Sequence, residues 1–556
     1  MPSVFLGDLR FEGLQVSVHR LHHVGLPIEV PRSIGADALS ALFKPLSFLL
    51  VEGGDSRLAV DPATKANVYG CRSHPTPGTL AFSSSTATSI SERAYRRAEC
   101  ARNELIEESI ALDVLEAFDR RVERMRHSLR SCLELDGAEI VFSPSGTDTQ
   151  LHALFFARQL LGGPVTSIVM ASDQTGSGTV YTSRGQNFSN RTAQGKSVEK
   201  GTPIDGLADD VDSLGVSMFA PDGAIRSASE IDAAVIEAVA GQIRLGRKVV
   251  LQTMDSSKLG WRAPSDGCLR YTCARWPHAV QIVVDACQMR IGRPRLRDYL
   301  DRGYIVLVTG SKFFTGPAFS GASLFGAALA DRAAAWTALP DGLAQYATRY
   351  DLPLRWLSAR AALPAAPNFG QWLRWEAALE EMRAYYALPE STRRSALMRL
   401  AEAIPVLIAS SEHLELMAGQ GVLADALDDE EMSCRTIFPF FVKRGGRTLD
   451  LDEMTKIYHA LNRDFSAALP DMDAERALAS VPCHIGQPVK LPAAGGAVLR
   501  IGIGARLLSQ AWSADARTVE ENIGAVIDRV DTVVRKIDLI VRTGIHNPVE
   551  RRTMAV

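Results

Sequence analysis

The sequence predicts an α/β protein, with a mostly parallel sheet layered against helices in a large domain and a smaller α+β domain after it. Three observations predict this fold. Between residues 135 and 330, short apolar runs alternate with stretches of helical spacing. These runs are apolar throughout, not at every second position, which is typical of strands buried on both faces. After about residue 345, helical patterns come first and strand-like runs follow, which favours a separate α+β domain.

The elements of the large domain follow in order along the chain. Its strands are expected at residues 138–142, 165–170, 248–253, 280–284, 304–308 and 322–325. Its helices are expected at 92–130, 150–161 and 230–243. The Ser/Thr-rich stretch 82–91 leads into the first helix, and Ser91 is the expected N-cap. The polar stretch 190–212 is expected to be a long loop or an insertion.

The smaller domain is predicted from helical patterns at 369–386 and 391–409 and from strand-like runs at 436–442 and 498–503. A C-terminal amphipathic helix follows, and its apolar stripe is expected to be packing surface. The expected division is an N-terminal segment 1–65, a large domain 66–345 and a small C-terminal domain 346–556.

Composition and charge exclude several classes of function. The 556 residues include 61 basic and 64 acidic ones, a net charge of −3, so no basic excess is available for nucleic acid. No apolar run approaches the ~20 residues that cross a bilayer, so no membrane partner is expected. Cys268, Cys273 and His278 match no common zinc spacing, so no metal is expected. Scattered cysteines and the lack of a signal peptide favour the cytoplasm.

The segment Ser145-Gly146-Thr147-Asp148 follows an expected strand and opens an expected helix. Small residues there let backbone N–H groups approach an anion, and the helix N-terminus adds positive potential. A phosphate site is one interpretation. An ordinary N-cap is the other, and the motif alone does not separate them.

Asp285 ends a buried run and is followed by Ala286-Cys287-Gln288. Ligands bind at the carboxyl edge of open parallel sheets, so this acid is expected near a ligand. A carboxylate there could hold a protonated heteroaromatic nitrogen. It could equally cap the turn that follows.

Lys312 lies in Thr309-Gly310-Ser311-Lys312-Phe313-Phe314, directly after the apolar run 304–308. Partial desolvation in such a place lowers a lysine's pKa and favours the free amine that Schiff-base chemistry needs. The hydroxyls of Thr309 and Ser311 could bind a phosphate. The alternative is a solvated surface lysine, for which these neighbours are unusual.

In this order the three motifs resemble those of fold-type I enzymes that use pyridoxal 5′-phosphate (PLP), most of all the class V aminotransferase and cysteine desulfurase branch. The Asp-to-Lys separation, 312 − 285 = 27 residues, suits that branch. The resemblance covers about residues 65 to 330 well and the C-terminal domain more loosely. It implies a three-layer α/β/α domain, PLP as the cofactor and a homodimer with shared active sites.

The resemblance also implies roles for individual residues. Lys312 would form the Schiff base and move protons at Cα, and Asp285 would pair with the ring nitrogen. Gln288 would hydrogen-bond the 3′-oxygen of the ring. Arg500 would bind the substrate carboxylate with its planar fork, and Arg506 is the fallback. The phosphate would be held by Gly146, Thr147, Thr309 and Ser311.

Two positions depart from the pattern of that branch. Where it has Glu-His, with the histidine stacked on the ring, this sequence has Asp173-Gln174. The amide of Gln174 could lie over the ring or belong to a polar turn. Where the branch often has Asn beside the substrate, this chain has Ser257. Lys258 could compete with Lys312 for the Schiff base, but it precedes the aspartate, which is the wrong order.

The expected function is therefore a PLP-dependent enzyme that acts on an α-amino acid through a Cα carbanion. It would be an aminotransferase, or a lyase that eliminates or replaces a group at Cβ or Cγ in specialised metabolism. One alternative is a cysteine desulfurase-like C–S lyase using Cys483, although Ile485 stands at the aligned position and cannot act as a nucleophile. The other is a non-catalytic relative that keeps the fold as a binding protein.

Overall fold

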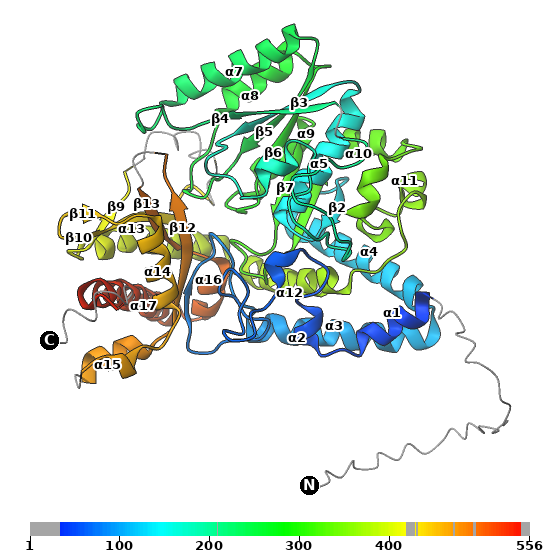
Figure 1. The fold of residues 1–556 in the computed structure, drawn as a ribbon. Coiled ribbons are helices and arrows are strands. Elements are labelled where there is room, and N and C mark those ends of the chain that lie inside the picture. Colours follow the sequence, from blue (N-terminus) through cyan, green and yellow to red (C-terminus); the bar gives the residue numbers. More distant parts are fainter. Residues whose placement is uncertain are drawn as a thin grey trace, which may run out of the picture.

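A computed structural model describes residues 34–207, 210–418, 429, 432–470, 473–492 and 496–545. The chain forms two sheets, each with its own helices (Figure 1). The first sheet has seven strands: β2 Glu139–Ser143, β3 Val165–Met170, β4 Val211–Val216, β5 Lys248–Met254, β6 Val280–Asp285, β7 Ile305–Thr309 and β8 Gly321–Phe325. Their order across the sheet is β2-β8-β7-β6-β5-β3-β4, and only β8 runs antiparallel to its neighbours.

Neighbouring residues of these strands pack into different cores. On β5, Val249 and Leu251 belong to one hydrophobic cluster and Val250 belongs to another. On β6, Val284 belongs to the first of these clusters and Val283 belongs to the second. Successive side chains of a strand point to opposite faces, so the sheet is covered on both sides. The expected three-layer α/β/α fold with a mostly parallel sheet is confirmed.

Helices of the two layers bury their apolar positions in these cores. One face carries α5 Gly146–Leu161, α10 Ala327–Ala334 and α11 Leu357–Ala361. The other carries α3 Glu92–Ala111, α4 Val114–Leu133, α7 Ala228–Arg244, α8 Asp266–Arg275, α9 Arg293–Asp301 and α12 Phe369–Tyr386. Two N-terminal helices, α1 Ile34–Leu42 and α2 Leu46–Leu49, lie along α3, α4 and α12 (Figure 1).

The second sheet lies in the expected smaller domain. Its path is β1 Leu80–Phe82, β12 Cys483–Lys490, β13 Ala497–Gly502, β10 Ile437–Arg444 and β11 Arg447–Thr448, and β9 Leu414–Leu416 pairs with β10. The helices around it are α13 Glu390–Ala409, α14 Leu451–Leu461, α15 Asp473–Ser480, α16 Ala505–Ala511 and α17 Ala516–Thr543. The smaller α+β domain is thereby confirmed.

Most expected elements are observed, and the differences have physical reasons. The helix expected at 92–130 is two helices, because Asp113 accepts a hydrogen bond from the Leu115 N–H and starts α4. Ser91 caps α3 as predicted, since its hydroxyl accepts from Ala94 N. The stretch expected to be a loop at 190–212 ends in β4, an edge strand.

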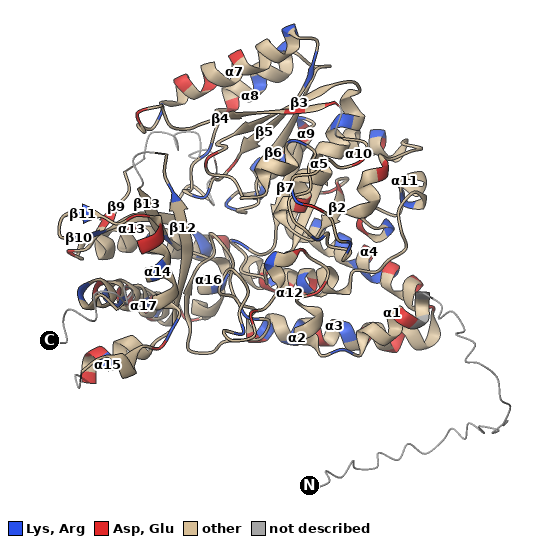
Figure 2. Ribbon diagram, viewed as in Figure 1, with Lys and Arg blue, Asp and Glu red and all other residues tan. Residues whose placement is uncertain are grey.

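Two sets of contacts cross the expected domain boundaries. Strand β1, from the segment assigned to the large domain, pairs with β12 of the smaller one. Trp356, beyond the expected boundary at 345, packs edge-on against Phe156 and Phe325 of the large domain. The division at residues 65 and 345 therefore stays a prediction. Acidic and basic positions are interspersed over both parts (Figure 2).

Candidate functional site

The candidate site lies at the carboxyl edge of the seven-stranded sheet. Parallel strands bring their carboxyl ends to one edge, where the loops that follow them meet. Residues 171–174 follow β3, residues 255–258 follow β5 and residues 286–288 follow β6. Residues 310–312 follow β7, which pairs with β6 at Asp285 and Leu307. The polar motifs singled out in the sequence thus share one edge.

Lys312 lies in a setting that favours its neutral amine. Burial lowers the pKa of its ammonium, and Arg500 and Arg290 lower it further, whereas Cys287 and Asp285 raise it. No hydrogen bond or ion pair joins its Nζ to another of the described residues. A half-buried lysine whose pKa is lowered, and whose amine has no partner among the described residues, has the character of a reactive group rather than a structural one.

Asp285 is oriented by two donors. The backbone N–H of Cys287 donates to Oδ1 at 3.0 Å, and the Gln150 amide donates to Oδ2 at 3.0 Å. The other end of that amide accepts a hydrogen bond from Thr179 Oγ1 at 2.8 Å. Gln150 was not predicted as a site residue from the sequence. A polar residue one turn after Gly146, on an otherwise buried helix, was the available signal.

The helix entrance at α5 is closely packed. Ser145 caps the helix by accepting from Thr147 N and Asp148 N. A Cβ added to Gly146 would lie 3.1 Å from Cys287 Sγ and 3.4 Å from Thr309 Cγ2, so a larger residue would crowd the edge. Thr309 donates its hydroxyl to Cys287 O at 2.7 Å, while Ser311 is buried. Gly146, Thr147 and Thr309 lie close together here, and their role toward a phosphate stays a prediction.

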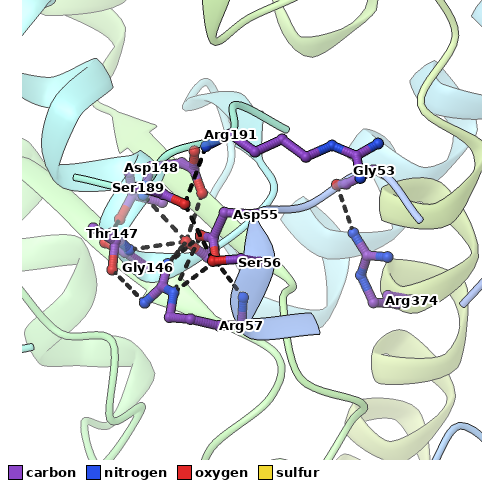
Figure 3. A network of polar contacts seen from close by, with 12 residues as sticks. Gly53, Asp55, Ser56, Arg57, Gly146, Thr147, Asp148, Ser189, Arg191 and Arg374 are labelled. Atoms are coloured by element: carbon purple, nitrogen blue, oxygen red, sulfur yellow. Dashed lines mark hydrogen bonds and ion pairs between the residues drawn. The ribbon is translucent and has the colours of Figure 1, made fainter. Parts of the chain in front are cut away.

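Arg57 also lies at this entrance, and the sequence analysis did not identify it. Its Nη1 donates to Thr147 Oγ1 at 2.9 Å and its Nη2 donates to Ser145 Oγ at 3.2 Å (Figure 3). It comes from the short helix η1 Ser56–Leu58, about ninety residues earlier in the chain. Nothing local in the sequence indicates this contact.

Arg500, the expected carboxylate ligand, is buried and directs its N–H groups at oxygens of the chain. Its Nε and Nη2 donate to Gln487 O at 3.1 and 2.8 Å, and Nη2 also donates to Thr86 Oγ1 at 2.9 Å. Its Nη1 donates to Lys258 O at 3.1 Å and Ser85 O at 3.4 Å. A guanidinium has five N–H donors, so each has a partner before any substrate binds.

Lys258 is the second lysine of the site. Burial lowers the pKa of its ammonium to about 8, helped by Arg500 and Lys312. None of the described residues hydrogen-bonds or ion-pairs with its Nζ. Burial also lowers the pKa of Arg290 to about 9 and that of Arg500 to about 10. Arg290, Arg500, Lys258 and Lys312 interact electrostatically at this edge and lower the pKa of one another, which suits the edge to an anionic ligand.

The remaining predicted site residues form hydrogen bonds with other residues of the chain. Gln288 donates to Ser85 O at 3.1 Å and accepts from Arg290 Nη1 at 2.7 Å. Ser257 accepts from the N–H groups of Leu259 and Trp261 at 3.1 and 3.2 Å, which stabilises a turn. Gln174 is buried, and its Oε1 has no hydrogen-bond partner among the residues that the structure describes. Their roles toward a ligand stay predictions.

Cys483 does not lie in the setting that the desulfurase alternative requires. It begins strand β12, is buried and donates its thiol to Val481 O at 3.5 Å. Burial raises the pKa of this thiol to about 11, although Lys536 opposes the shift. A desulfurase needs a thiolate on an accessible loop, so this setting does not favour the alternative based on Cys483.

Among the residues that the structure describes, no three His, Cys, Asp or Glu side chains form a group that could hold a metal ion. None of the helices described is both long and apolar enough to span a bilayer.

Comparisons with known proteins give a distant likeness in fold. No protein-family model and no curated protein sequence matches the chain. Among solved structures, mouse CSAD matches with 15% identity and a TM-score of 0.44, over 82% of this chain and 83% of that one. A NifS-like protein matches with 12% identity and a TM-score of 0.45, over 81% and 98%. A structure described as SPT with PLP matches with 14% identity and a TM-score of 0.42, over 79% and 84%. At such identities and scores the likeness carries no conclusion about activity.

Proposed function

We propose that this protein is a PLP-dependent enzyme of fold type I that acts on an α-amino acid. The observation that carries the proposal is the half-buried Lys312 amine, which has no partner among the described residues, beside the oriented Asp285 carboxylate at the carboxyl edge of the sheet. The residues fit the cofactor, because its aldehyde needs a free amine and its ring nitrogen an anion. Its phosphate needs donors such as those at the start of α5.

When bound, PLP would supply an electron sink for a bond broken at the substrate Cα. Lys312 would hold the cofactor through Nζ and, once released by the incoming amine, take up or return the proton at Cα. Asp285 would face the ring nitrogen, with Gln150 and the Cys287 N–H fixing its orientation. Thr147 and the N–H groups of α5 would face the phosphate.

The substrate carboxylate would meet the cationic side of the site. Lys258 is the better partner for direct contact, because its ammonium is not held by the chain, whereas the Arg500 donors are directed at backbone and hydroxyl oxygens. A retained carboxylate favours transamination, or elimination and replacement at Cβ or Cγ, over decarboxylation. The class V branch, a cytoplasmic homodimer with shared sites, and the roles of Gln174, Gln288 and Ser257 are parts of this proposal.

The experiment is an absorbance titration of apo protein with PLP, followed by a screen of amino acids. We expect wild type and Lys258→Met, but not Lys312→Met, to show the band of a protein-bound Schiff base. Amino acids that are substrates will change this band, and product analysis then gives the bond broken. An identical PLP spectrum in wild type and Lys312→Met would refute the proposal, and binding without any change by amines would favour the non-catalytic alternative.

A further inference from the structure

The N-terminal segment 53–58 is fastened over the start of α5 by buried polar contacts. Arg374 of α12 donates to the carbonyl oxygens of Gly53 at 3.0 Å, Leu50 at 3.2 Å and Glu52 at 2.6 Å. Asn368 also donates to Gly53 O at 3.1 Å. This anchoring places Arg57 at the helix entrance, as Figure 3 shows. A buried arginine bound to carbonyl oxygens fixes backbone position, so the location of Arg57 is built into the fold.

The Arg57 side chain is held with one side toward α5. Its Nε and Nη2 donate to the Asp55 carboxylate at 2.9 and 2.6 Å, a paired contact that fixes the plane of the guanidinium. Phe319 and Phe188 lie 5.0 and 5.6 Å from it, measured from Cζ to the ring centroids. Nη1 and Nη2 are thereby directed at the hydroxyls of Thr147 and Ser145 (Figure 3).

Two groups at this entrance still have hydrogen-bonding capacity. Thr147 Oγ1 accepts from Arg57, and its own proton has no acceptor among the residues described. Asp148 is 1% exposed, and its Oδ2 accepts from Ser145 Oγ at 2.5 Å. Its Oδ1 is buried without a partner in the described part of the chain. Buried polar atoms are normally satisfied, so the unpartnered Asp148 Oδ1 atom indicates a missing ligand.

The protonation state of Asp148 sets the charge of this cluster and so decides whether the cluster can bind an anion. Burial, and then Asp55, raise the pKa of its carboxyl to about 7, while Ser145 and Arg57 oppose the shift. Arg374 and Tyr346 are the other titratable groups close enough to interact with it. With Asp148 ionised, the Asp55 and Asp148 carboxylates offset the charges of Arg57 and Arg374. With Asp148 protonated, the cluster has a net positive charge and the helix N-terminus adds positive potential.

We propose that Arg57 and protonated Asp148 form a clasp for a phosphate monoester at the start of α5, in which anion binding and proton uptake by Asp148 are coupled. The inference rests on the proposed function, because the phosphate would be that of PLP. Arg57 and Thr147 donate hydrogen bonds to the phosphate oxygens. When Asp148 is protonated at Oδ1, this O–H donates a further hydrogen bond. The proton comes from solvent and returns there when the phosphate leaves.

Sulfate is the first probe, because it stays dianionic over the whole pH range used, whereas inorganic phosphate itself titrates near neutral pH. Calorimetric titrations of apo protein with sodium sulfate are run from pH 6.0 to 8.5. We expect the wild-type affinity to fall about tenfold per pH unit above pH 7, which is the linkage of one proton. In Asp148→Asn the affinity should stay level over this range. A wild-type dependence that is unchanged in this variant overturns the clasp.

The charge of Arg57 is tested with Arg57→Met and with the control Arg191→Met. Arg191 is an exposed arginine beside the same site, where its backbone N–H donates to Ser189 Oγ at 3.4 Å (Figure 3). We expect Arg57→Met to weaken sulfate and PLP binding at least tenfold and the control to change neither. Sulfate and PLP affinities within twofold of wild type in Arg57→Met contradict the proposal.

Pyridoxal, which lacks the phosphate, separates this inference from the proposed function. If pyridoxal and PLP both fail to react with Lys312 in wild type, the proposed function fails. If both react and Arg57→Met binds PLP as wild type does, only the clasp fails. Unchanged pyridoxal binding and an unchanged thermal midpoint show that Arg57→Met is folded. A variant that does not fold is replaced by Arg57→Lys, for which we expect partial binding of sulfate.

Discussion

Gln150 on helix α5 donates its amide N–H to Oδ2 of Asp285 at the end of strand β6, at 3.0 Å. The contact joins a helix of one layer to the central sheet, across 135 residues of sequence. Because Oδ1 accepts from Cys287 N, both oxygens of the carboxylate are held before a ligand arrives. The orientation of Asp285 is therefore set by the fold and not by the cofactor.

Removing that amide should weaken cofactor binding. Hydrogen bonds to charged groups contribute roughly 1.5–3 kcal/mol, so Gln150→Met is expected to raise the PLP dissociation constant by about ten- to a hundredfold. The side chain keeps a similar length, so the thermal midpoint of the apo protein should change little. Absorbance titration with PLP measures the effect, and a wild-type dissociation constant would show that Gln150 does not position Asp285.

The Lys258 amine should titrate at a lower pH than that of an ordinary lysine. Because burial lowers the pKa of Lys258 to about 8, its amine is neutral and reactive above pH 8 in the folded apo protein. Its acylation, followed by peptide mass spectrometry, should rise with a midpoint near pH 8. In the unfolded chain the midpoint should return to about 10.4, the usual lysine value. Equal midpoints in the folded and unfolded chains would contradict the placement of Lys258.

Substitutions of Arg500 and Lys258 should separate a structural cation from a ligand-binding one. Arg500→Met leaves buried carbonyl oxygens without donors, at a cost of about 1–3 kcal/mol for each, so the thermal midpoint should fall clearly. Lys258→Met removes no side-chain hydrogen bond or ion pair between described residues and should keep the wild-type midpoint. It should instead weaken binding of amino acids more than binding of the matching amines without a carboxylate. Equal loss for both ligand types would place the substrate carboxylate elsewhere.

Acid should destabilise the fold through two buried histidines. Burial lowers the pKa of His152 and His484 to about 4, below the usual 6.5, so the folded state binds fewer protons than the unfolded one. Their contribution is fully present above pH 6.5 and is lost as the pH falls toward 4. From pH 6.5 to 5 this amounts to roughly 2 kcal/mol for each histidine.

Thermal midpoints at pH 7 and 5 measure this dependence. His484 is chosen because its Nε2 lies 2.8 Å from Tyr69 O and 3.1 Å from Tyr458 Oη, contacts that a glutamine amide can replace. The His484→Gln variant should lose less stability than wild type between the two values. A drop equal to that of wild type would show that this histidine titrates in the folded state as it does in water.

The sequence predicted most of the strands that build the sheet, because buried parallel strands are continuous apolar runs. It also predicted that Lys312 and Asp285 share an edge, because each follows such a strand. It did not predict β4, since this edge strand, Val211–Val216, has exposed polar positions and lacks the apolar run. The predicted helix boundaries were wrong where a single N-cap residue starts a new helix, as Asp113 does for α4.

Contacts between distant segments could not be predicted. Arg57 reaches Thr147 across 90 residues, and no spacing or composition near either residue indicates it. The contacts of Arg500 could not be predicted for the same reason. Its residue type and strand suggest a carboxylate ligand, but its donors are directed at the backbone oxygens of three separate segments. Whether the N–H groups of an arginine are available to a ligand depends on the folded chain around it. A sequence motif does not indicate this.

The most direct test is borohydride reduction of the PLP-loaded protein, followed by peptide mapping. The amine of Lys312 is expected to be bonded to the cofactor, so the mass of a reduced pyridoxyl phosphate should appear on the peptide that contains Lys312. The peptide that contains Lys258 should remain unmodified. Label on Lys258 in place of Lys312, or no label on either peptide at full PLP occupancy, would contradict the proposed function.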